Sequence, residues 1–375
     1  MKIVFVSNYY NHHQHALCRE LERMNPGQFH FIATSEMRQD RKTLGYGNWD
    51  IPDFVRTAHT GVADRLASRK LIDEADVVIA GATPERLIAD RIWAGKLTFR
   101  YTERLFKQPP SALEYLKKRV VQKLRNPSRK PVYLLCAGAY TKADFTRLGV
   151  FRNRGYRWGY FPETKHYGAD ELRCGKNPAS LLWVGRFLDW KHPDDALRAV
   201  ARLRDAGYEF RLRLIGTGPL EQQLRAMVST LKLEQYVSFL GTMKPEQVRC
   251  HMEHAGIFLF TSDRQEGWGA VLNEALNSGC AVVSSCDAGS VPYLIEDEKN
   301  GLIYRSGDVD MLYEKIKTLL DSPEKQAALG INAYHAITEL WNAQTAAKRL
   351  CALAEQILAG EKTPDLYQTG PCAKA

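Results

Sequence analysis

Two glutamates, Glu266 and Glu274, flank a glycine-bearing turn in the stretch EGWGAVLNE. The apolar run at 257–260 is typical of a buried strand, and after the turn apolar residues recur at helical spacing. The first turn of a helix offers free amide groups and the positive end of the helix dipole, so this stretch predicts an anion site. Taken alone, the two glutamates are better explained as a capping acid and a solvated helix residue.

A basic loop follows the earlier strand-like run at 181–184 and reads GRFLDWK. Arg186 and Lys191 could converge on one phosphate group, because arginine offers a planar fork of donors and lysine a compact charge. An ordinary basic loop is the simpler alternative for this stretch alone. The phosphate interpretation therefore depends on whether other loops complete a site.

The next strand-like run, 211–215, ends in GTGPLE. Gly216 and Gly218 would let the backbone approach a flat ligand, and Pro219 suits the first position of a helix. Two glycines are weak evidence, because Glu221 stands where a dinucleotide fingerprint has its third glycine. The following run ends in LGTMKPEQV, another glycine turn before a helical stretch.

Strands and helices that alternate along the chain must position these loops. The strand-like runs are 3–6, 29–33, 76–80, 97–101 and 132–136, and then 181–184, 211–215, 237–240, 257–260 and 281–284. This alternation predicts an α/β fold with two Rossmann-like domains built on parallel sheets. Because ligands of such sheets bind at the carboxyl ends of the strands, we expect the two domains to face one another across a cleft.

The 375 residues are too many for one ordinary core and favour two domains. We predict an N-terminal domain at 1–162, a linker at 163–179 and a C-terminal domain at 180–340. Residues 341–375 are expected to form a helix that crosses back to the N-terminal domain, followed by a frayed polar tail.

The location of the protein is predicted from what its sequence lacks. No apolar run approaches the length of a membrane span, and the first residues do not resemble a signal peptide. We therefore expect a cytosolic protein. The eight cysteines form no CxxC pair, so buried reduced thiols are more consistent with the sequence than disulfides or a zinc site.

Positive charge is concentrated in one segment of the chain. The formal charge is +9, yet the segment 104–157 alone holds fourteen Lys/Arg against Glu114 and Asp144. Within it, LEYLKKRVVQKL at 113–124 places apolar residues on one side of a helix, as a helix lying on the inner face of the plasma membrane would. An ordinary domain helix with its apolar side inward is an equal alternative. Nucleic-acid binding is a rival for the same charge, but no recognised motif supports it.

Taken together, four motifs resemble the retaining glycosyltransferases of the GT-B fold, specifically glycosyltransferase family four. They are VGRFLDWKHPDDAL, LIGTGPLEQQL, FLGTMKPEQV and EGWGAVLNEALNSGCAVVSS, and GSVPYLIEDEKNGLIY extends the likeness. It covers about 181–304 closely, whereas the N-terminal domain matches only in its order of strands and helices. The resemblance implies a nucleotide-sugar-binding C-terminal domain and an acceptor-side N-terminal domain.

The same resemblance implies an activity. A sugar would move from a nucleotide-diphosphate donor, UDP- or GDP-linked, to a hydroxyl acceptor, possibly lipid-linked. The product would belong to polysaccharide, glycolipid or glycoconjugate synthesis, and no separate cofactor is expected. A GT-B-type nucleotide-sugar epimerase or phosphorylase is the enzymatic alternative, because such an enzyme uses the same cleft without a separate acceptor.

Roles for single residues also come from the resemblance. Arg186 and Lys191 would hold the donor diphosphate from one side, and the amides after Glu266 from the other. Glu266 itself would contact the donor sugar, and Glu274 would bind the ribose hydroxyls. The other donor-binding positions are turn amides and loops bordering the base: Gly216, Gly218, Pro219, Thr242, Met243, Gly267, Trp268, Gly269, Ala270 and Val271.

The N-terminal domain departs from the family pattern in two places. Where members commonly have a glycine-rich turn, this chain has SNYYNHHQH with His12 and His13. Their imidazoles could replace the amides of that turn, but surface or helix-capping histidines are the simpler interpretation. Where many members have a histidine near the acceptor, this chain has YTER with Glu103. We expect Glu103 to contact donor sugar or acceptor.

Two other mechanisms are disfavoured by spacing. If Glu266 and Glu274 lie on one helix, eight residues separate them by about 12 Å, whereas retaining glycosidases hold their carboxylates about 5–5.5 Å apart. A metal-dependent transferase would need a D-x-D motif, and Asp308-Val309-Asp310 precedes a helical run, where Asp308 suits an N-cap. The sequence thus predicts a metal-independent transferase, and analogy predicts retention at the anomeric carbon.

Overall fold

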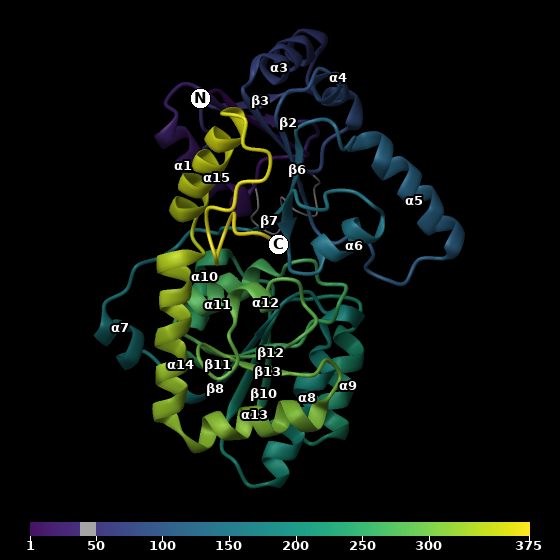
Figure 1. The fold of residues 1–375 in the computed structure, drawn as a ribbon. Helices are drawn as coiled ribbons and strands as arrows, with labels where there is room; N and C mark the ends of the chain where they lie inside the picture. The colour runs from purple at the N-terminus through teal and green to yellow at the C-terminus, as the bar shows by residue number, and fades with distance from the viewer. Residues whose placement is uncertain (38–49) are drawn as a thin grey trace. The chain divides into compact units, whose positions relative to one another are not determined.

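The computed structural model describes residues 1–37 and 50–375, which form two compact units (Figure 1). The first unit contains Met1–Glu163 and Trp341–Ala375, and the second contains Thr164–Leu340. Each unit is built on one parallel sheet with helices, so the predicted pair of Rossmann-like domains is confirmed.

The first sheet has the order β3-β2-β1-β4-β5-β6-β7. Its central strands are almost fully buried, as expected of a parallel sheet covered on both faces. The strands are β1 (Ile3–Ser7), β2 (Phe29–Ala33), β3 (Val55–Thr57), β4 (Val77–Ala80), β5 (Thr98–Thr102), β6 (Val132–Ala137) and β7 (Gly155–Trp158). The sequence analysis missed the two edge strands, β3 and β7, because each is very short and lacks a continuous apolar run.

Helices connect these strands. They are α1 (His12–Met24), α3 (Val62–Glu74), η1 (Glu85–Leu87), α4 (Ala89–Trp93), α5 (Ala112–Arg125) and α6 (Thr141–Arg147). The C-terminal helix α15 (Ala343–Leu358) packs against α1, where Asn25 donates a 3.7 Å hydrogen bond to the sulfur of Cys351. The end of the chain therefore contributes to the core of the first unit.

The tail after α15 is not frayed, contrary to the prediction. Lys374 forms an antiparallel bridge with Tyr156 on β7, and the amide of Arg157 donates to the carbonyl of Ala373 at 2.8 Å. Cys372 and Ala373 are buried. The polar composition misled the prediction, because backbone hydrogen bonds to an open sheet edge do not depend on apolar side chains.

The second sheet has the order β10-β9-β8-β11-β12-β13. Its strands are β8 (Asn177–Val184), β9 (Arg211–Ile215), β10 (Val237–Gly241), β11 (Ala255–Phe260), β12 (Ala281–Ser285) and β13 (Leu302–Tyr304). Its helices are α7 (Ala169–Cys174), η2 (Asp189–Lys191), α8 (Pro193–Asp205), α9 (Glu221–Thr230), α10 (Pro245–His254), α11 (Ala270–Asn277), α12 (Val291–Leu294), α13 (Val309–Asp321), α14 (Pro323–His335) and the π-helical Ala336–Leu340. The order reverses between β8 and β11, so the carboxyl ends of these two strands mark the point where ligands of open α/β sheets bind.

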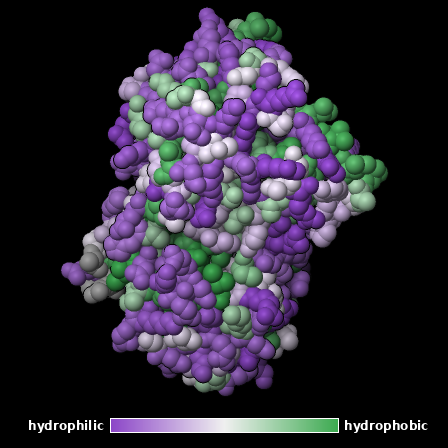
Figure 2. All heavy atoms as spheres, in the orientation of Figure 1, coloured by the Kyte–Doolittle hydropathy of each residue, from purple (hydrophilic) through white to green (hydrophobic). Residues whose placement is uncertain are grey.

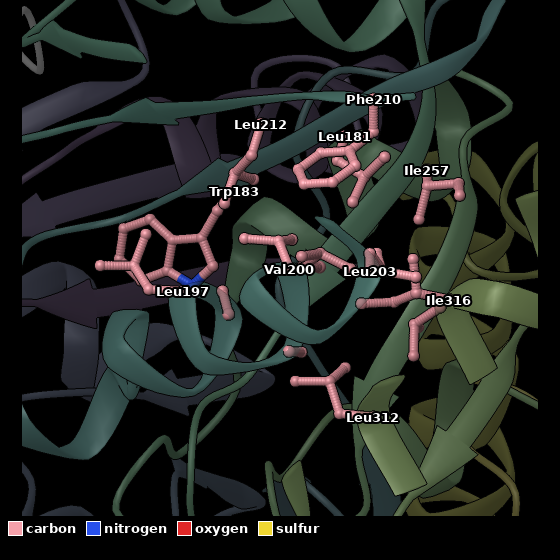
Figure 3. Packing of buried hydrophobic residues seen from close by; sticks show 14 of the residues in the cluster. Leu181, Trp183, Leu197, Val200, Leu203, Phe210, Leu212, Ile257, Leu312 and Ile316 are labelled. Carbon is pink, nitrogen blue, oxygen red and sulfur yellow. The ribbon is translucent and has the colours of Figure 1, made fainter. Parts of the chain in front are cut away.

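The core of the second unit lies between the sheet and the helices α8 and α13. Trp183 and Leu212 from the strands pack against Val200 of α8 and Ile316 of α13, all buried (Figure 3). This packing fixes the strand ends from which the loops of the site emerge.

The segment predicted as a linker, 163–179, has regular structure. It holds α7 and the start of β8, which begins three residues before the predicted domain boundary. Its prolines and glycines suggested an irregular connection, but Pro178 lies near the start of β8, where a missing donor is tolerated.

Within residues 1–37 and 50–375, no helix combines the length and apolar character needed to cross a bilayer. The cytosolic location stays a prediction.

Candidate functional site

The turn before α11 is held in a conformation that requires glycine. Gly269 has φ of 86°, and a Cβ atom there would lie 2.4 Å from Cζ of Phe260. The helix begins at Ala270, with no side chain capping its N-terminus. In the part of the chain that the structure describes, the amides of Gly269, Ala270 and Val271 make no recorded hydrogen bond. These free amides at the positive end of a helix can receive an anion.

Trp268 anchors this turn from inside. Its indole is fully buried and donates a 2.8 Å hydrogen bond to Oδ1 of Asn273, while its carbonyl accepts a 2.5 Å bond from Ser290. A side chain held in this way fixes the backbone of Gly267 and Gly269 and does not itself face a ligand. The sequence placed Trp268 among the donor-binding positions without separating the backbone from the indole.

The structure brings Lys191 and Glu266 together from separate loops. Nζ of Lys191 forms an ion pair with Oε2 of Glu266, and both side chains are mostly buried. The loops are fastened at two further points, because Thr261 donates to the carbonyl of Lys191 at 2.5 Å and the amide of Asp263 donates to the carbonyl of Trp190 at 2.8 Å. The cation and carboxylate that the sequence assigned to diphosphate and sugar are thus direct neighbours.

The glycines after β9 serve contacts between loops. A Cβ at Gly216, where φ is 134°, would lie 1.9 Å from the carbonyl oxygen of Gly185, and one at Gly218 would lie 2.5 Å from that of Phe187. The amide of Phe187 donates to the carbonyl of Thr217 at 2.9 Å. The sequence predicts that the two glycines let the backbone approach a flat ligand, but in the structure they let one loop lie on the next.

The remaining predicted positions of this unit differ in their exposure. Arg186 is exposed, and within the described ranges no hydrogen bond or ion pair of its guanidinium is recorded. Thr242 is exposed and its hydroxyl lies 3.2 Å from that of Thr217, while Met243 is half-buried. Pro219 does not open α9, which begins at Glu221.

Glu274 occupies a different environment from Glu266. Burial raises the pKa of Glu274, and the guanidinium of Arg249 on α10 acts in the opposite direction. Arg249 is buried and donates to Oδ1 of Asn277 at 2.8 Å and to the carbonyl of Glu274 at 3.2 Å. The sequence gave no signal for Arg249, because its partners come from another helix.

Glu266 and Glu274 do not lie on one helix, which was the premise of the predicted separation. Glu266 lies four residues before the first residue of α11, so the rise of a helix does not describe its separation from Glu274. What distinguishes the pair is their partners, since Lys191 faces one and Arg249 the other. The two carboxylates therefore lie in different electrostatic surroundings.

In the first unit, Glu103 belongs to an aromatic cluster at the strand ends. The hydroxyl of Tyr160, just after β7, donates to Oε1 of Glu103 at 2.8 Å, and Lys107 lies 3.3 Å from the other oxygen. The ring of Tyr160 stacks on His13 with centroids 5.6 Å apart, and His13 lies against His12 at 3.7 Å. Sequence reasoning named the histidines and Glu103 but missed Tyr160, which no motif marks.

Two groups of acidic side chains in the second unit have the residue types of metal ligands. Asp308 caps α13 by accepting a 2.9 Å bond from the amide of Met311, as predicted, and Asp310 pairs with Arg202. Among the described residues, His192, Asp194 and Asp195 bring their ligand atoms within 4.8 Å of one another. Arg198 pairs with both aspartates at 2.7 and 2.9 Å, and burial raises the pKa of Asp195. Both aspartates lie in the first turn of α8, where acids are favourable without a metal.

Comparison with known proteins finds a family model that matches most of the second unit. Residues 170–336 match a family model described as "Glycosyl transferases group 1". The chain is 29% identical over 160 residues to the putative colanic acid biosynthesis glycosyltransferase WcaL of Escherichia coli. It is 27% identical over 198 residues to a GDP-mannose-dependent phosphatidylinositol monomannoside mannosyltransferase of Mycolicibacterium smegmatis. These matches cover 41% and 51% of this chain but only 39% and 51% of the relatives' own lengths.

A solved structure matches nearly the whole chain. It is that of HepE from Anabaena in complex with UDP, with a TM-score of 0.72, 18% identity, and coverage of 95% of this chain and 100% of that one. The likeness confirms the predicted fold class in both units.

Proposed function

Because residues 170–336 match the family model of the glycosyl transferases of group 1, we propose that the protein transfers a sugar from a nucleotide-diphosphate donor to a hydroxyl acceptor. The observation that carries the proposal is the ion pair between Lys191 and Glu266, which lies beside the uncapped N-terminus of α11. A cation, a carboxylate and free amides on neighbouring loops suit a ligand that has both phosphate and hydroxyl groups.

The donor diphosphate is assigned to the amides of Gly269, Ala270 and Val271 and to the side chains of Arg186 and Lys191. Binding would exchange the ion pair of Lys191 with Glu266 for a contact of Lys191 with phosphate. Glu266 would then be free to accept from the sugar hydroxyls, and Glu274 from the ribose. Thr242 and Met243 border the base in this proposal.

The chemistry follows from where negative charge develops. As the bond between the anomeric carbon and the diphosphate breaks, charge collects on the phosphate oxygens, where pre-oriented amides and cations stabilise it. The acceptor hydroxyl attacks the same face of the sugar, which gives retention. NMR of the product tests this step, and an inverted anomeric configuration would contradict it.

Metal independence is part of the proposal, because the D-x-D sequence at 308–310 is engaged in capping α13 and in an ion pair with Arg202. Activity should persist in EDTA. Loss of activity that Mg²⁺ or Mn²⁺ restores would contradict this and would direct attention to His192, Asp194 and Asp195.

The first experiment should identify the base and the sugar of the donor. The names of the two relatives, one in colanic acid biosynthesis and one a GDP-mannose-dependent mannosyltransferase, support acceptors in polysaccharide or glycolipid synthesis. A thermal-shift panel with UDP, GDP, ADP and their sugars identifies the donor, because a ligand that binds only the folded state raises its stability. No shift with any nucleotide diphosphate would contradict the proposal.

A further inference from the structure

The helix α5 carries a row of apolar side chains in solvent. Leu113, Leu116, Val120 and Leu124 are 78%, 56%, 53% and 64% exposed, and no residue of the helix is buried. We call this row the α5 ridge. Its members recur at spacings of three and four, so they share one side of the helix. Figure 2 shows the ridge as a hydrophobic area at the right edge, where Figure 1 places α5.

The opposite side of α5 is fastened to the first unit. The hydroxyl of Tyr115 donates to the carbonyl of Arg147 at 2.6 Å, and its ring lies against that of Phe106. Lys118 lies over the Phe106 ring at 4.9 Å. After the helix, Asn126 accepts a 3.0 Å bond from Arg100. The structure therefore argues against an ordinary domain helix with its apolar side inward, because the apolar side faces outward while the helix itself is anchored.

Basic residues flank the ridge on both sides. At about 100° per residue, Lys117 falls on one side of the ridge and Lys123 on the other. Between residues 111 and 130 there are seven Lys/Arg and one acid, Glu114, which pairs with Lys118 at 2.8 Å. For Lys117, Arg119 and Lys123, no ion pair is recorded within residues 1–37 and 50–375. The partner of this surface must therefore be both apolar and anionic.

We propose that α5 docks the protein on a bilayer that contains anionic phospholipid. The ridge enters the boundary between headgroups and acyl chains, and the flanking lysines reach the lipid phosphates. A protein partner or a second copy of the chain would have to offer an acidic apolar surface, whereas an anionic bilayer offers both properties along the whole length of the helix. The docking goes beyond the proposed transfer reaction and requires neither donor nor acceptor.

Helix α3 of the same unit provides a matched control. Its Leu66 is 64% exposed, as Leu124 is, but α3 carries three basic and three acidic residues. If exposed apolar area alone caused adsorption, both helices would contribute. If apolar area and excess positive charge act together, only α5 will.

The test is co-sedimentation of the full chain with vesicles of phosphatidylcholine, with and without phosphatidylglycerol. We expect binding only to the mixed vesicles, and weaker binding as salt rises. Leu124→Gln, and separately Lys117→Glu with Lys123→Glu, should each lower the partition coefficient at least about tenfold, the second by removing attraction to the anionic surface. Leu66→Gln, and Arg65→Glu with Lys70→Glu, should leave it unchanged.

Three results would overturn the proposal. They are no binding to mixed vesicles at low salt, equal losses in the α5 and α3 variants, and dimerisation in sedimentation velocity that Leu124→Gln abolishes without any vesicle binding. All substituted side chains are exposed, and unchanged melting temperatures would show that the variants fold. Nucleotide affinity measured on the same variants separates this proposal from the transfer reaction, because neither change touches the second unit.

Discussion

The two units have the same kind of parallel sheet, but their strand ends are built differently. In the second unit, the loops after β8, β9 and β11 are fastened to one another through backbone hydrogen bonds and through glycines that tolerate no side chain. In the first unit, side chains from distant segments meet at the strand ends, where Tyr160 joins Glu103 and His13.

This difference bears on how each unit could change during evolution. When loops are held together by backbone hydrogen bonds, both the spacing of residues along each loop and the residue types are constrained. This fits the match of 170–336 to a family model. A cluster of side chains on separate loops can change its members one at a time. The donor site proposed above lies in the constrained loops of the second unit, whereas Glu103 lies in the variable cluster of the first unit.

The largest expected effect is a loss of stability when the glycine turn of the second unit is altered. Gly269→Ala should lower the free energy of unfolding by about 2–5 kcal/mol, from left-handed strain of about 1–2 kcal/mol and overpacking against Phe260 of about 1–3 kcal/mol. Gly207 also has a positive φ, of 81°, but open space around its Cβ position, so Gly207→Ala should show the strain alone. Urea unfolding measures both, and equal losses would mean that the approach to Phe260 does not hold the turn.

The second-largest expected effect is a loss of nucleotide affinity when a charged side chain of the second unit is removed. Lys191→Ala should weaken binding of the nucleotide diphosphate roughly tenfold to hundredfold, since a hydrogen bond to a charged group contributes about 1.5–3 kcal/mol. Titration calorimetry with the nucleotide identified by thermal shift gives the affinity. Lys348→Ala, at an exposed position on α15, is the control. Unchanged affinity in Lys191→Ala would remove the diphosphate from this loop.

A smaller effect is expected from the first unit, where a substitution should change turnover but not nucleotide affinity. Tyr160→Phe removes the hydroxyl that donates to Glu103 but keeps the ring on His13. Glu103 then loses a hydrogen bond that orients its carboxylate and contributes about 1 kcal/mol. Turnover should fall by up to about tenfold with nucleotide affinity unchanged. Tyr133→Phe removes a comparable hydroxyl, bonded at 2.9 Å to the carbonyl of Lys362, and should leave turnover unaffected. A change in nucleotide affinity in Tyr160→Phe would contradict the division between the units.

The smallest effect is a dependence on pH. Burial raises the pKa of Glu274 above its ordinary value of 4.5, so the folded chain keeps this proton to higher pH than the unfolded chain does. Ionisation of Glu274 therefore costs stability as pH rises from about 4.5 through the folded pKa.

Glu274→Gln should consequently melt slightly above the wild type at neutral pH, with the difference vanishing in acid. Melting curves across pH measure this, and Glu246→Gln at an exposed position on α10 should show no such trend. The same variant should bind nucleotide more weakly if Glu274 holds the ribose. A melting temperature below that of the wild type at neutral pH would mean that the carboxylate stabilises the fold.

Sequence reasoning was most successful where neighbours along the chain are also neighbours in space. It located the glycine turn at 266–271 and the basic loop at 185–191, because each is a short connection after a strand. It misjudged the tail at 361–375 and missed Arg249, because backbone pairing with β7 and a contact between helices leave no periodic signal. It also gave Trp268 a place beside the ligand, although a buried indole and an exposed one look the same in a sequence.

The sequence by itself determined the two parallel sheets, the glycine turn and the charge excess of α5, since these depend on local conformation, apolar period and composition. Only the tertiary structure decided which side chains meet and which way α5 faces. Lys191 reaches Glu266 and Tyr160 reaches Glu103 because strands far apart in the chain end at the same edge of a sheet. The α5 ridge is exposed because Tyr115 and Asn126 fasten the other side of the helix, and an amphipathic pattern alone does not say which side the fold will cover.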